Sequence, residues 1–496
     1  MVVSFFSDFL HLLPQIFYFV VLLVGLSVFS AYNTFYRSSG RPAAVQISSF
    51  LAYNSLLLVV LLVPFFSFSY FGAFSNLVFS PALHFYTLLA AVGLFSTLYV
   101  HSFYSTYSDL NQFETPLFMS LVFLSTLVVF YSNDFLVAYL GLEFQALALY
   151  VLAASRVNST YSTEAGLKYF VLGSFASCLL LLGVSFLYGL TGLTNFSDLG
   201  SYLLVPTETF NSQATLLSLL LIVLGLLFKV GAAPFHFWVP DVYTGAPIVI
   251  TSFFAIVPKL AAWVLLLKLS LFCLQFYFDF FSNFFVAIGL LSLVVGAYGA
   301  VFQLSLKRIL AFSAIAHTGY LLLSLASFQS TTFTAVLMYL SLYIVSLLPV
   351  FIILVLYFPK NTSSSAVESV YGLRYLYKHN PLLCLILVLS LFSLAGVPPF
   401  SGFFAKLYIF FVIVNSKLLY AAILALFLSS ASAVYYLKII RFSFFFKNFR
   451  EFLLFNEITR PIAYLISTLF VLNISFFAWG SDFLLVLSQF HSNFVL

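Results

Sequence analysis

Charged side chains are scarce in this sequence. Of 496 residues, 19 are Lys or Arg and 14 are Asp or Glu, so only 7% of the chain is charged. An average soluble domain is about a quarter charged. Hydrophobic residues make up 63%. This composition excludes a soluble enzyme, a nucleic-acid-binding protein and a disordered scaffold, and it leaves an integral membrane protein with many spans.

Sequence motifs for cofactors and metals are missing as well. The three cysteines, Cys178, Cys273 and Cys384, lie far apart in apolar runs, which fits neither a disulfide framework nor a metal site. The sequence has no P-loop, no dinucleotide-binding glycine fingerprint, no CxxC and no HExxH, and no span carries paired histidines for haem. We therefore expect no redox centre, no metal and no nucleotide in this chain.

The N-terminus lacks the features of a cleavable targeting segment. It has no basic n-region and no small-residue cleavage site, and it is not rich in Arg and Ser. We therefore expect the first hydrophobic run to be retained as a span. Phe is abundant, at 66 residues, which suggests a thymine-rich organellar gene because TTT encodes Phe. Together these features predict synthesis in the mitochondrial matrix and a multi-pass protein of the inner membrane.

Long apolar runs are what the sequence has in plenty. A spanning helix needs about 20 apolar residues, and these runs lack the alternation of barrel strands. We predict an all-α polytopic membrane protein with about 14 transmembrane helices. Their expected ranges are 10–32, 46–70, 81–104, 115–132, 134–155, 162–190, 213–240, 247–272, 280–304, 307–328, 331–358, 381–415, 417–442 and 459–488.

Two of these helices contain glycine and proline breaks. Gly231-Ala-Ala-Pro234 interrupts the seventh and Gly396-Val-Pro398-Pro399 the twelfth, because proline removes a donor and clashes with the preceding turn. The two breaks are similar in sequence and five spans apart. Since an odd offset reverses the orientation of a helix in the membrane, they indicate inverted-topology repeats with broken helices.

The repeats divide the chain into four predicted segments. Residues 1–105 form an N-terminal three-helix segment, 106–275 the first five-helix repeat, and 276–445 the second. Residues 446–496 form a C-terminal loop and the fourteenth helix.

The basic residues test the number of spans. Odd-numbered loops hold eleven of them: Arg37, Arg41, Arg156, Lys307, Arg308, Lys360, Arg374, Lys378, Lys447, Arg450 and Arg460. Even-numbered loops hold only Lys417 and Lys268. This positive-inside bias predicts that both termini face away from the compartment of synthesis, into the intermembrane space. The basic stretch 441–455 is expected to be a loop at the membrane surface.

A few ionisable residues fall inside the predicted spans, where a charge costs about 2.5–3.5 kcal/mol. They are Glu143, Lys168, Lys229, Lys259, His317 and Lys406. Desolvation disfavours an ammonium group and a nearby carboxylate favours it. A Glu–Lys pair whose members approach and separate is therefore a protonation switch, and a row of them bridged by water is a proton path.

Structural roles are open for the same residues. Glu164 and Lys168, at i,i+4 near a helix start, fit an interfacial ion pair. His317 fits a neutral histidine bonded to a facing helix. Lys259 fits a lysine that snorkels to the membrane surface.

Two further structural alternatives concern lysines near helix ends. A buried structural salt bridge is the alternative for Glu143 and Lys229. Lys268 is expected to snorkel from the end of its helix and not to belong to a site.

Four stretches carry a resemblance to a known family. They are GLEFQALALY at 141–150, EAGLKYFVLG at 164–173, FKVGAAPFHFWVPDVYTGAP at 228–247 and AGVPPFSGFFAK at 395–406. They resemble the antiporter-like proton-pumping subunits of respiratory complex I over roughly residues 80–445. Lysine at 406 favours the chain 2 branch, because the chain 4 type typically carries glutamate at this point. Residues 1–80 and 446–496 match no motif.

The resemblance implies a membrane-arm subunit of a proton-pumping NADH:ubiquinone oxidoreductase. NAD, FMN, iron–sulfur clusters and ubiquinone would be bound by other subunits. The implied partners are other membrane-arm subunits and membrane lipids, with cardiolipin as a candidate, and no nucleic acid. Other possibilities are a cation/proton antiporter subunit, a plastid-type plastoquinone reductase chain, and a purely structural scaffold.

The resemblance also implies residue roles. The family's central hydrophilic axis consists of a fifth-helix glutamate and the lysines of helices seven, eight and twelve. The matching residues here are Glu143, Lys229, Lys259 and Lys406, with Lys168 matching a sixth-helix lysine and His317 a polar position of the tenth.

Overall fold

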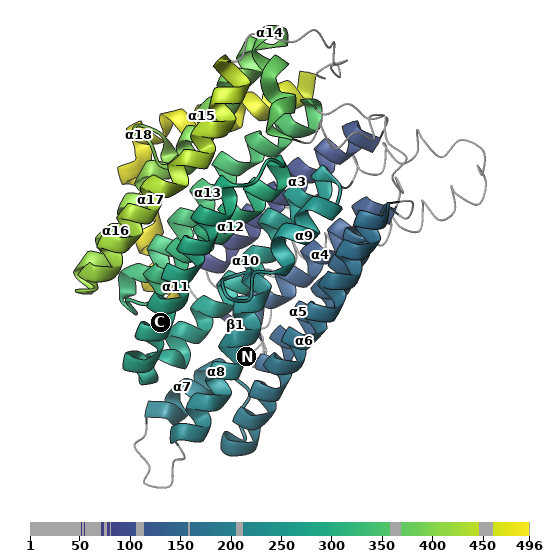
Figure 1. The fold of residues 1–496 in the computed structure, drawn as a ribbon. Coiled ribbons are helices and arrows are strands. Elements are labelled where there is room, and N and C mark those ends of the chain that lie inside the picture. Colours follow the sequence, from purple (N-terminus) through teal and green to yellow (C-terminus); the bar gives the residue numbers. More distant parts are fainter. Residues whose placement is uncertain are drawn as a thin grey trace, which may run out of the picture. The chain divides into compact units, whose positions relative to one another are not determined.

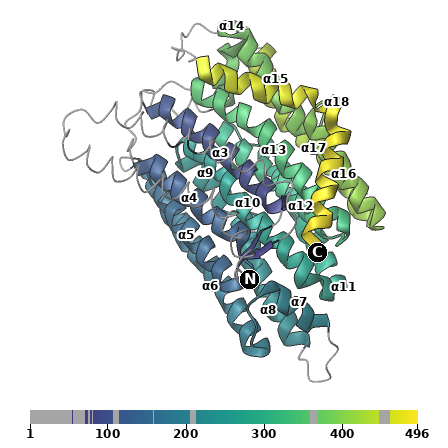
Figure 2. The same ribbon diagram turned by 180° about the vertical axis from the view of Figure 1, so that it is seen from behind.

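The structure, a computed structural model, describes residues 71–73, 77–79, 81–105, 114–156, 159–204, 212–357, 369–445 and 460–495, together with Leu51 and Asn54 (Figures 1 and 2). It consists of two compact units. The first contains residues 1–230, 253–281 and 489–496, and the second contains residues 231–252 and 282–488.

The first unit is built from long apolar helices and one short hairpin. Its elements are β1 (Phe71–Ala73), β2 (Leu77–Phe79), α3 (Pro81–Ser105), α4 (Glu114–Tyr131), α5 (Phe135–Ala153), α6 (Thr160–Thr191), α7 (Phe196–Leu204), α8 (Ser212–Val230), most of α10 (Ile248–Phe272) and η2 (Leu274–Tyr277). Helix α6 packs between α5 and α8. Gly183 on α6 lets α8 approach, because an added Cβ would lie 2.8 Å from the Ser218 carbonyl oxygen.

The second unit is entirely helical in its described part. Its elements are α9 (Trp238–Gly245), most of α11 (Phe278–Val301), α12 (Leu306–Leu325), α13 (Ser330–Tyr357), η3 (Val370–Tyr375), α14 (Leu376–His379), α15 (Pro381–Ala395), α16 (Ser401–Asn415), α17 (Leu419–Ile440), η4 (Arg441–Phe445) and most of α18 (Arg460–Val495). Helix α13 packs against both α15 and α16, and α12 packs against α9 and α16.

The predicted all-α polytopic class is confirmed. Within the described ranges, eleven helices are long and apolar enough to cross a membrane, and α15 and α16 are shorter apolar helices. The predicted helices 10–32 and 46–70 lie outside the described residues, apart from Leu51 and Asn54. The number fourteen and the division into four segments therefore stay predictions. The β1–β2 hairpin and α7 were not predicted, because both are too short to span a membrane.

Both predicted helix breaks are confirmed. Residues 231–237 separate α8 from α9, and residues 396–400 separate α15 from α16. Each break starts at a glycine in the left-handed region, with φ of 80° at Gly231 and 88° at Gly396, where a side chain would be strained. The Gly396 N–H donates to the Phe392 carbonyl at 3.0 Å, which ends the helix. Each break leaves carbonyls at a helix end for other groups to bind.

Candidate functional site

Glu143 and Lys229 face each other in the first unit. Glu143 lies on α5 and Lys229 one residue before the end of α8, and their Oε1 and Nζ atoms are 3.5 Å apart. The side chains are 26% and 11% exposed, respectively. A tight charge-assisted hydrogen bond is about 2.7–2.9 Å long. The pair is thus in electrostatic contact without a tight bond, an arrangement that suits groups that associate and separate.

Two other predicted site lysines of the first unit differ in environment. Lys259, which follows Pro258 within α10, is buried, so the alternative of a snorkelling lysine is wrong. Lys168 and Glu164 form an ion pair on α6 with Nζ and Oε1 2.7 Å apart, and their side chains are 43% and 57% exposed. The ion pair of the structural alternative is therefore present. The role of Lys168 in a proton path stays a prediction.

Lys268 corrects the sequence analysis. It does not snorkel: its side chain is buried, and Nζ donates to the carbonyl oxygens of Phe130 and Ser132, both at 2.6 Å. These carbonyls lie at the C-terminal end of α4, where no further helical N–H is available to them. A cation at a helix C-terminus also interacts favourably with the helix dipole. Lys268 therefore holds α10 to the end of α4.

Basic side chains bind helix ends in the second unit too. On α17, Lys438 donates to the carbonyls of Val301 and Gln303 at 3.1 and 3.0 Å, at the end of α11. Lys307, predicted to be a loop charge, is buried in the first turn of α12 and donates to the Ala246 carbonyl at 3.1 Å. These lysines link one helix to the end of another. The positive-inside pattern counts basic residues by their position in the sequence, so it does not distinguish such lysines from loop charges.

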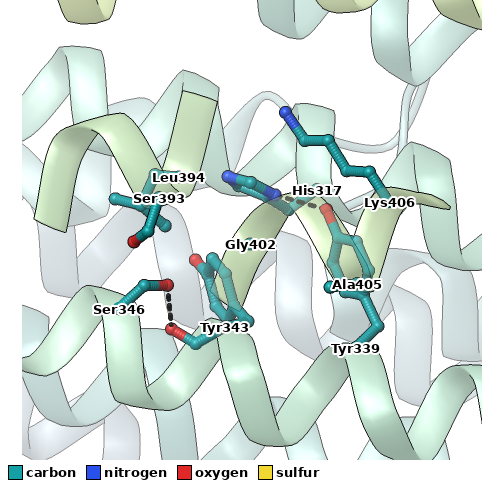
Figure 3. A pocket seen from close by; sticks show the side chains of 9 residues that line it. All are labelled: His317, Tyr339, Tyr343, Ser346, Ser393, Leu394, Gly402, Ala405 and Lys406. Carbon is teal, nitrogen blue, oxygen red and sulfur yellow. Dashed lines mark hydrogen bonds between the residues drawn. The ribbon is translucent and has the colours of Figure 1, made fainter. Parts of the chain in front are cut away.

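His317 is the centre of a polar cluster in the second unit. It is buried on α12, with Nδ1 2.5 Å from the Tyr339 hydroxyl of α13 (Figure 3). Its Nε2 lies 3.1 Å from the Tyr436 hydroxyl of α17. Both ring nitrogens thus have hydroxyl partners. The bonds of the structural alternative, a histidine bonded to facing helices, are therefore present. The same geometry lets a proton enter at one nitrogen and leave at the other.

Lys406 uses the second helix break. It is buried on α16, and Nζ donates to the carbonyl of Ala395, the last residue of α15, at 2.7 Å. Its ammonium also lies 5.3 Å from the centroid of the Tyr320 ring, a cation–π distance. A Cβ at Gly396 would lie 2.8 Å from Lys406 Cδ. The break therefore supplies both the acceptor for the ammonium and the space for its aliphatic chain.

A small cavity brings Lys406 and His317 together. It measures about 10 Å³, roughly the room that one water molecule needs. Figure 3 shows the lining side chains, which are His317, Tyr339, Tyr343, Ser346, Ser393, Leu394, Gly402, Ala405 and Lys406. Two ionisable groups and several hydroxyls thus line one small cavity. In the part of the chain that the structure describes, no three His, Cys, Asp or Glu side chains gather as metal ligands do.

The sequence analysis did not single out the tyrosines of this cluster. Tyr339 and Tyr343 are spaced i,i+4, so they share one face of α13, and both line the cavity. Tyrosine differs from phenylalanine only by the hydroxyl. The signal that could have found them is thus tyrosine at helical spacing in spans otherwise rich in phenylalanine.

Many apolar helices, two of them interrupted beside a lysine, define the class of this protein as an all-α polytopic membrane protein with discontinuous helices. Residues 132–432, more than half of the chain, match the family model described as NADH:quinone oxidoreductase/Mrp antiporter, transmembrane. The chain belongs to this family.

Relatives in the family match nearly the whole chain. NADH-ubiquinone oxidoreductase chain 2 of Marchantia polymorpha is 33% identical over 97% of this chain and 98% of its own length. NADH-quinone oxidoreductase subunit N of Bartonella bacilliformis is 35% identical over 94% and 93%. A chain of respiratory complex I from Thermus thermophilus with bound aureothin superposes with a TM-score of 0.76 at 28% identity, covering 94% of this chain and 99% of that one. The resemblance predicted from the four motifs is confirmed.

Proposed function

We propose that this chain is a proton-translocating membrane-arm subunit of NADH:ubiquinone oxidoreductase. NADH oxidation and quinone reduction elsewhere in the complex would drive proton transfer through Glu143, Lys229, Lys259, Lys406 and His317. One observation carries the proposal: the buried Lys406 ammonium binds a helix-end carbonyl and shares a water-sized cavity with His317. Such a lysine can bind and release a proton, and the histidine and tyrosine hydroxyls can pass it on.

Each unit would supply its own proton-binding group. In the first unit, Lys229 holds a proton while Glu143 is close and is free to release it when the two separate. In the second unit, a proton moves between Lys406 and His317 through water in the cavity, with the Tyr339 and Tyr436 hydroxyls as further partners.

The remaining parts of the proposal concern cofactors, partner subunits and location. This chain would hold no redox centre, and NAD, FMN, iron–sulfur clusters and ubiquinone would be bound by other subunits. Its partners would be other membrane-arm subunits, and its location the mitochondrial inner membrane with both termini in the intermembrane space. The chain 2 relative and the complex I neighbour support the partners.

Because the family model also covers Mrp antiporters, a cation/proton antiporter subunit is the second candidate. Co-purification without NADH-oxidising activity would favour it.

Replacing Lys406 tests the proposal. In the assembled complex in sealed vesicles, Lys406→Met should lower the rate of proton transfer by at least about tenfold, because losing an acid–base group costs roughly 10²–10⁴ in rate. Methionine keeps most of the side-chain volume and removes the ammonium. Lys417→Met, on the exposed turn between α16 and α17, is the matched control and should transfer protons normally. Normal transfer by the Lys406 variant would count against the proposal.

We also propose an anionic lipid, with cardiolipin as the candidate, at a basic surface formed by η3, α14 and η4. η3 and η4 pack together, and the Arg374 guanidinium lies 4.7 Å from the centroid of the Tyr371 ring. Lys378 and Arg441 are exposed beside it. Basic and aromatic side chains together are typical of the headgroup level of a membrane.

Lipid analysis of the purified complex tests this surface. Lys378→Gln combined with Arg441→Gln should lower the cardiolipin retained per complex, because two cationic groups are worth about 1 kcal/mol each near an anionic surface. Lys417→Gln should leave the lipid content unchanged. Unaltered cardiolipin in the double variant would overturn the assignment.

A further inference from the structure

Asn473 connects the two halves of the broken twelfth helix. It lies on α18 with its side chain buried, only 3% exposed. Its Nδ2 donates to the Ser393 hydroxyl at 3.1 Å, and its Oδ1 accepts from the Ser401 hydroxyl at 2.5 Å. Ser393 lies in the last turn of α15, whereas Ser401 is the first residue of α16. One amide therefore bridges the break, with its donor on one side and its acceptor on the other.

The half-helices meet closely at this bridge. An ideal Cβ at Gly402 would overlap the Ser393 carbonyl oxygen, so the backbones of α15 and α16 touch there. Ser393 and Gly402 also line the cavity that contains Lys406 and His317. The amide bridge and the proposed proton site therefore share the same backbone junction.

The end of α15 is bound from two directions. Lys406 of α16 binds the Ala395 carbonyl, and Asn473 of α18 binds the Ser393 hydroxyl two residues earlier. Neighbouring rings hold α18 against α16, since the ring centroids of Phe404 on α16 and Phe476 on α18 are 5.7 Å apart. A buried amide left without partners is costly. Movement of either half-helix away from the other would therefore break at least one bond of Asn473.

We propose that Asn473 is a positioning residue for Lys406. It fixes the end of α15 relative to the start of α16, so that the Ala395 carbonyl stays within reach of the Lys406 ammonium. This inference rests on the proposed function of Lys406. It gives α18 a role in the proton site, although the C-terminal region matches no family motif.

The competing explanation is that Asn473 only anchors α18 to the other helices. An anchor affects how much complex assembles, but leaves the assembled complex unchanged. A positioning residue affects proton transfer in the assembled complex, and its effect requires Lys406. The two explanations therefore predict different rates of proton transfer per assembled complex. An anchor leaves this rate unchanged, whereas a positioning residue lowers it when it is replaced.

The experiment compares variants of the whole complex in sealed vesicles. Asn473→Ala should lower the rate of proton transfer per assembled complex at least about fivefold, the factor that corresponds to the loss of one of its two hydrogen bonds. The pH profile of proton transfer should also shift, because the acceptor of the Lys406 ammonium is no longer fixed. Thr468→Ala is the control on the same helix: Thr468 is exposed, and within the described residues its hydroxyl donates only to the Leu465 carbonyl of its own helix. It should change neither quantity.

Double variants give the decisive result. Adding Asn473→Ala to Lys406→Met should cause no further loss, because positioning has no effect once the ammonium is gone. If Asn473→Ala does not assemble, Ser401→Ala, which removes only one of the two bonds, replaces it throughout. Normal transfer and pH profile in the assembled variant, or additive losses in the double variant, would overturn the inference.

If Lys406→Met itself transfers protons normally, the proposed function fails. If Lys406→Met is defective while Asn473→Ala is normal, only the positioning role fails.

Discussion

Replacing Lys229 with alanine should lower proton transfer by at least about tenfold while the complex still assembles. Lys229 is 11% exposed, and its Nζ lies 3.5 Å from Glu143 Oε1. Alanine removes the group that would bind and release the proton. Glu143 is 26% exposed, so its carboxylate is only partly desolvated. The loss of its partner should therefore leave assembly intact. Proton uptake per NADH oxidised in sealed vesicles measures the first effect, and the amount of complex on a native gel measures the second.

Lys229→Arg separates the two explanations of the pair. Arginine keeps its proton at any pH that the protein meets, whereas lysine can lose it when buried. The ion pair with Glu143 therefore survives the substitution, but release of a proton does not. If the pair is a proton switch, Lys229→Arg should be nearly as defective as Lys229→Ala. If the pair is a structural salt bridge, Lys229→Arg should transfer protons normally, and that outcome would remove Lys229 from the proposed path.

Residues such as Glu143 and Lys229 could be found in the sequence because a charge inside an apolar run is costly and visible. The helix breaks were equally predictable, since a glycine followed by proline interrupts a helix wherever it occurs. The long helices followed from the length that a membrane requires. In all three cases the physical cause acts within one short segment of chain, so the segment itself carries the signal.

The partners of these residues could not be predicted. Lys268 binds carbonyls at the end of α4, and every residue of the chain has a carbonyl, so its acceptors have no signature in the sequence. His317 bonds hydroxyls from two other helices, and Asn473 bridges two serines far from it in the chain. These contacts depend on which helix faces come together. For this reason Lys268 was expected to snorkel, although it is buried.

The positions of the two lysines relative to the breaks are different. Lys229 precedes its break within the last turn of α8, whereas Lys406 follows its break and reaches back to the carbonyl of Ala395. A helix end supplies free carbonyls and a partial negative charge, which favour a cation. At Lys406 this interaction is direct. The geometry of that break should therefore matter as much to function as the lysine itself.

Gly402→Ala should have the largest effect on assembly. The added Cβ would overlap the Ser393 carbonyl oxygen and lie 2.6 Å from its carbonyl carbon. Both are backbone atoms, so no side-chain rotation relieves the clash, and α16 must move away from α15. Overpacking typically costs about 1–3 kcal/mol and more where the backbone must shift. We therefore expect little assembled complex on a native gel.

Gly189→Ala is the matched control for this substitution. Gly189 lies in α6, and no neighbouring atom of the described residues is within 4 Å of the Cβ that alanine would add. Alanine is the better helix former by roughly 0.8–1.0 kcal/mol, so this variant should assemble at least as well as the original protein. Assembly of Gly402→Ala at the level of Gly189→Ala would show that α15 and α16 can separate at low cost. In that case the close junction would not hold Lys406 against Ala395, and normal proton transfer by the assembled variant would locate the function away from the second break.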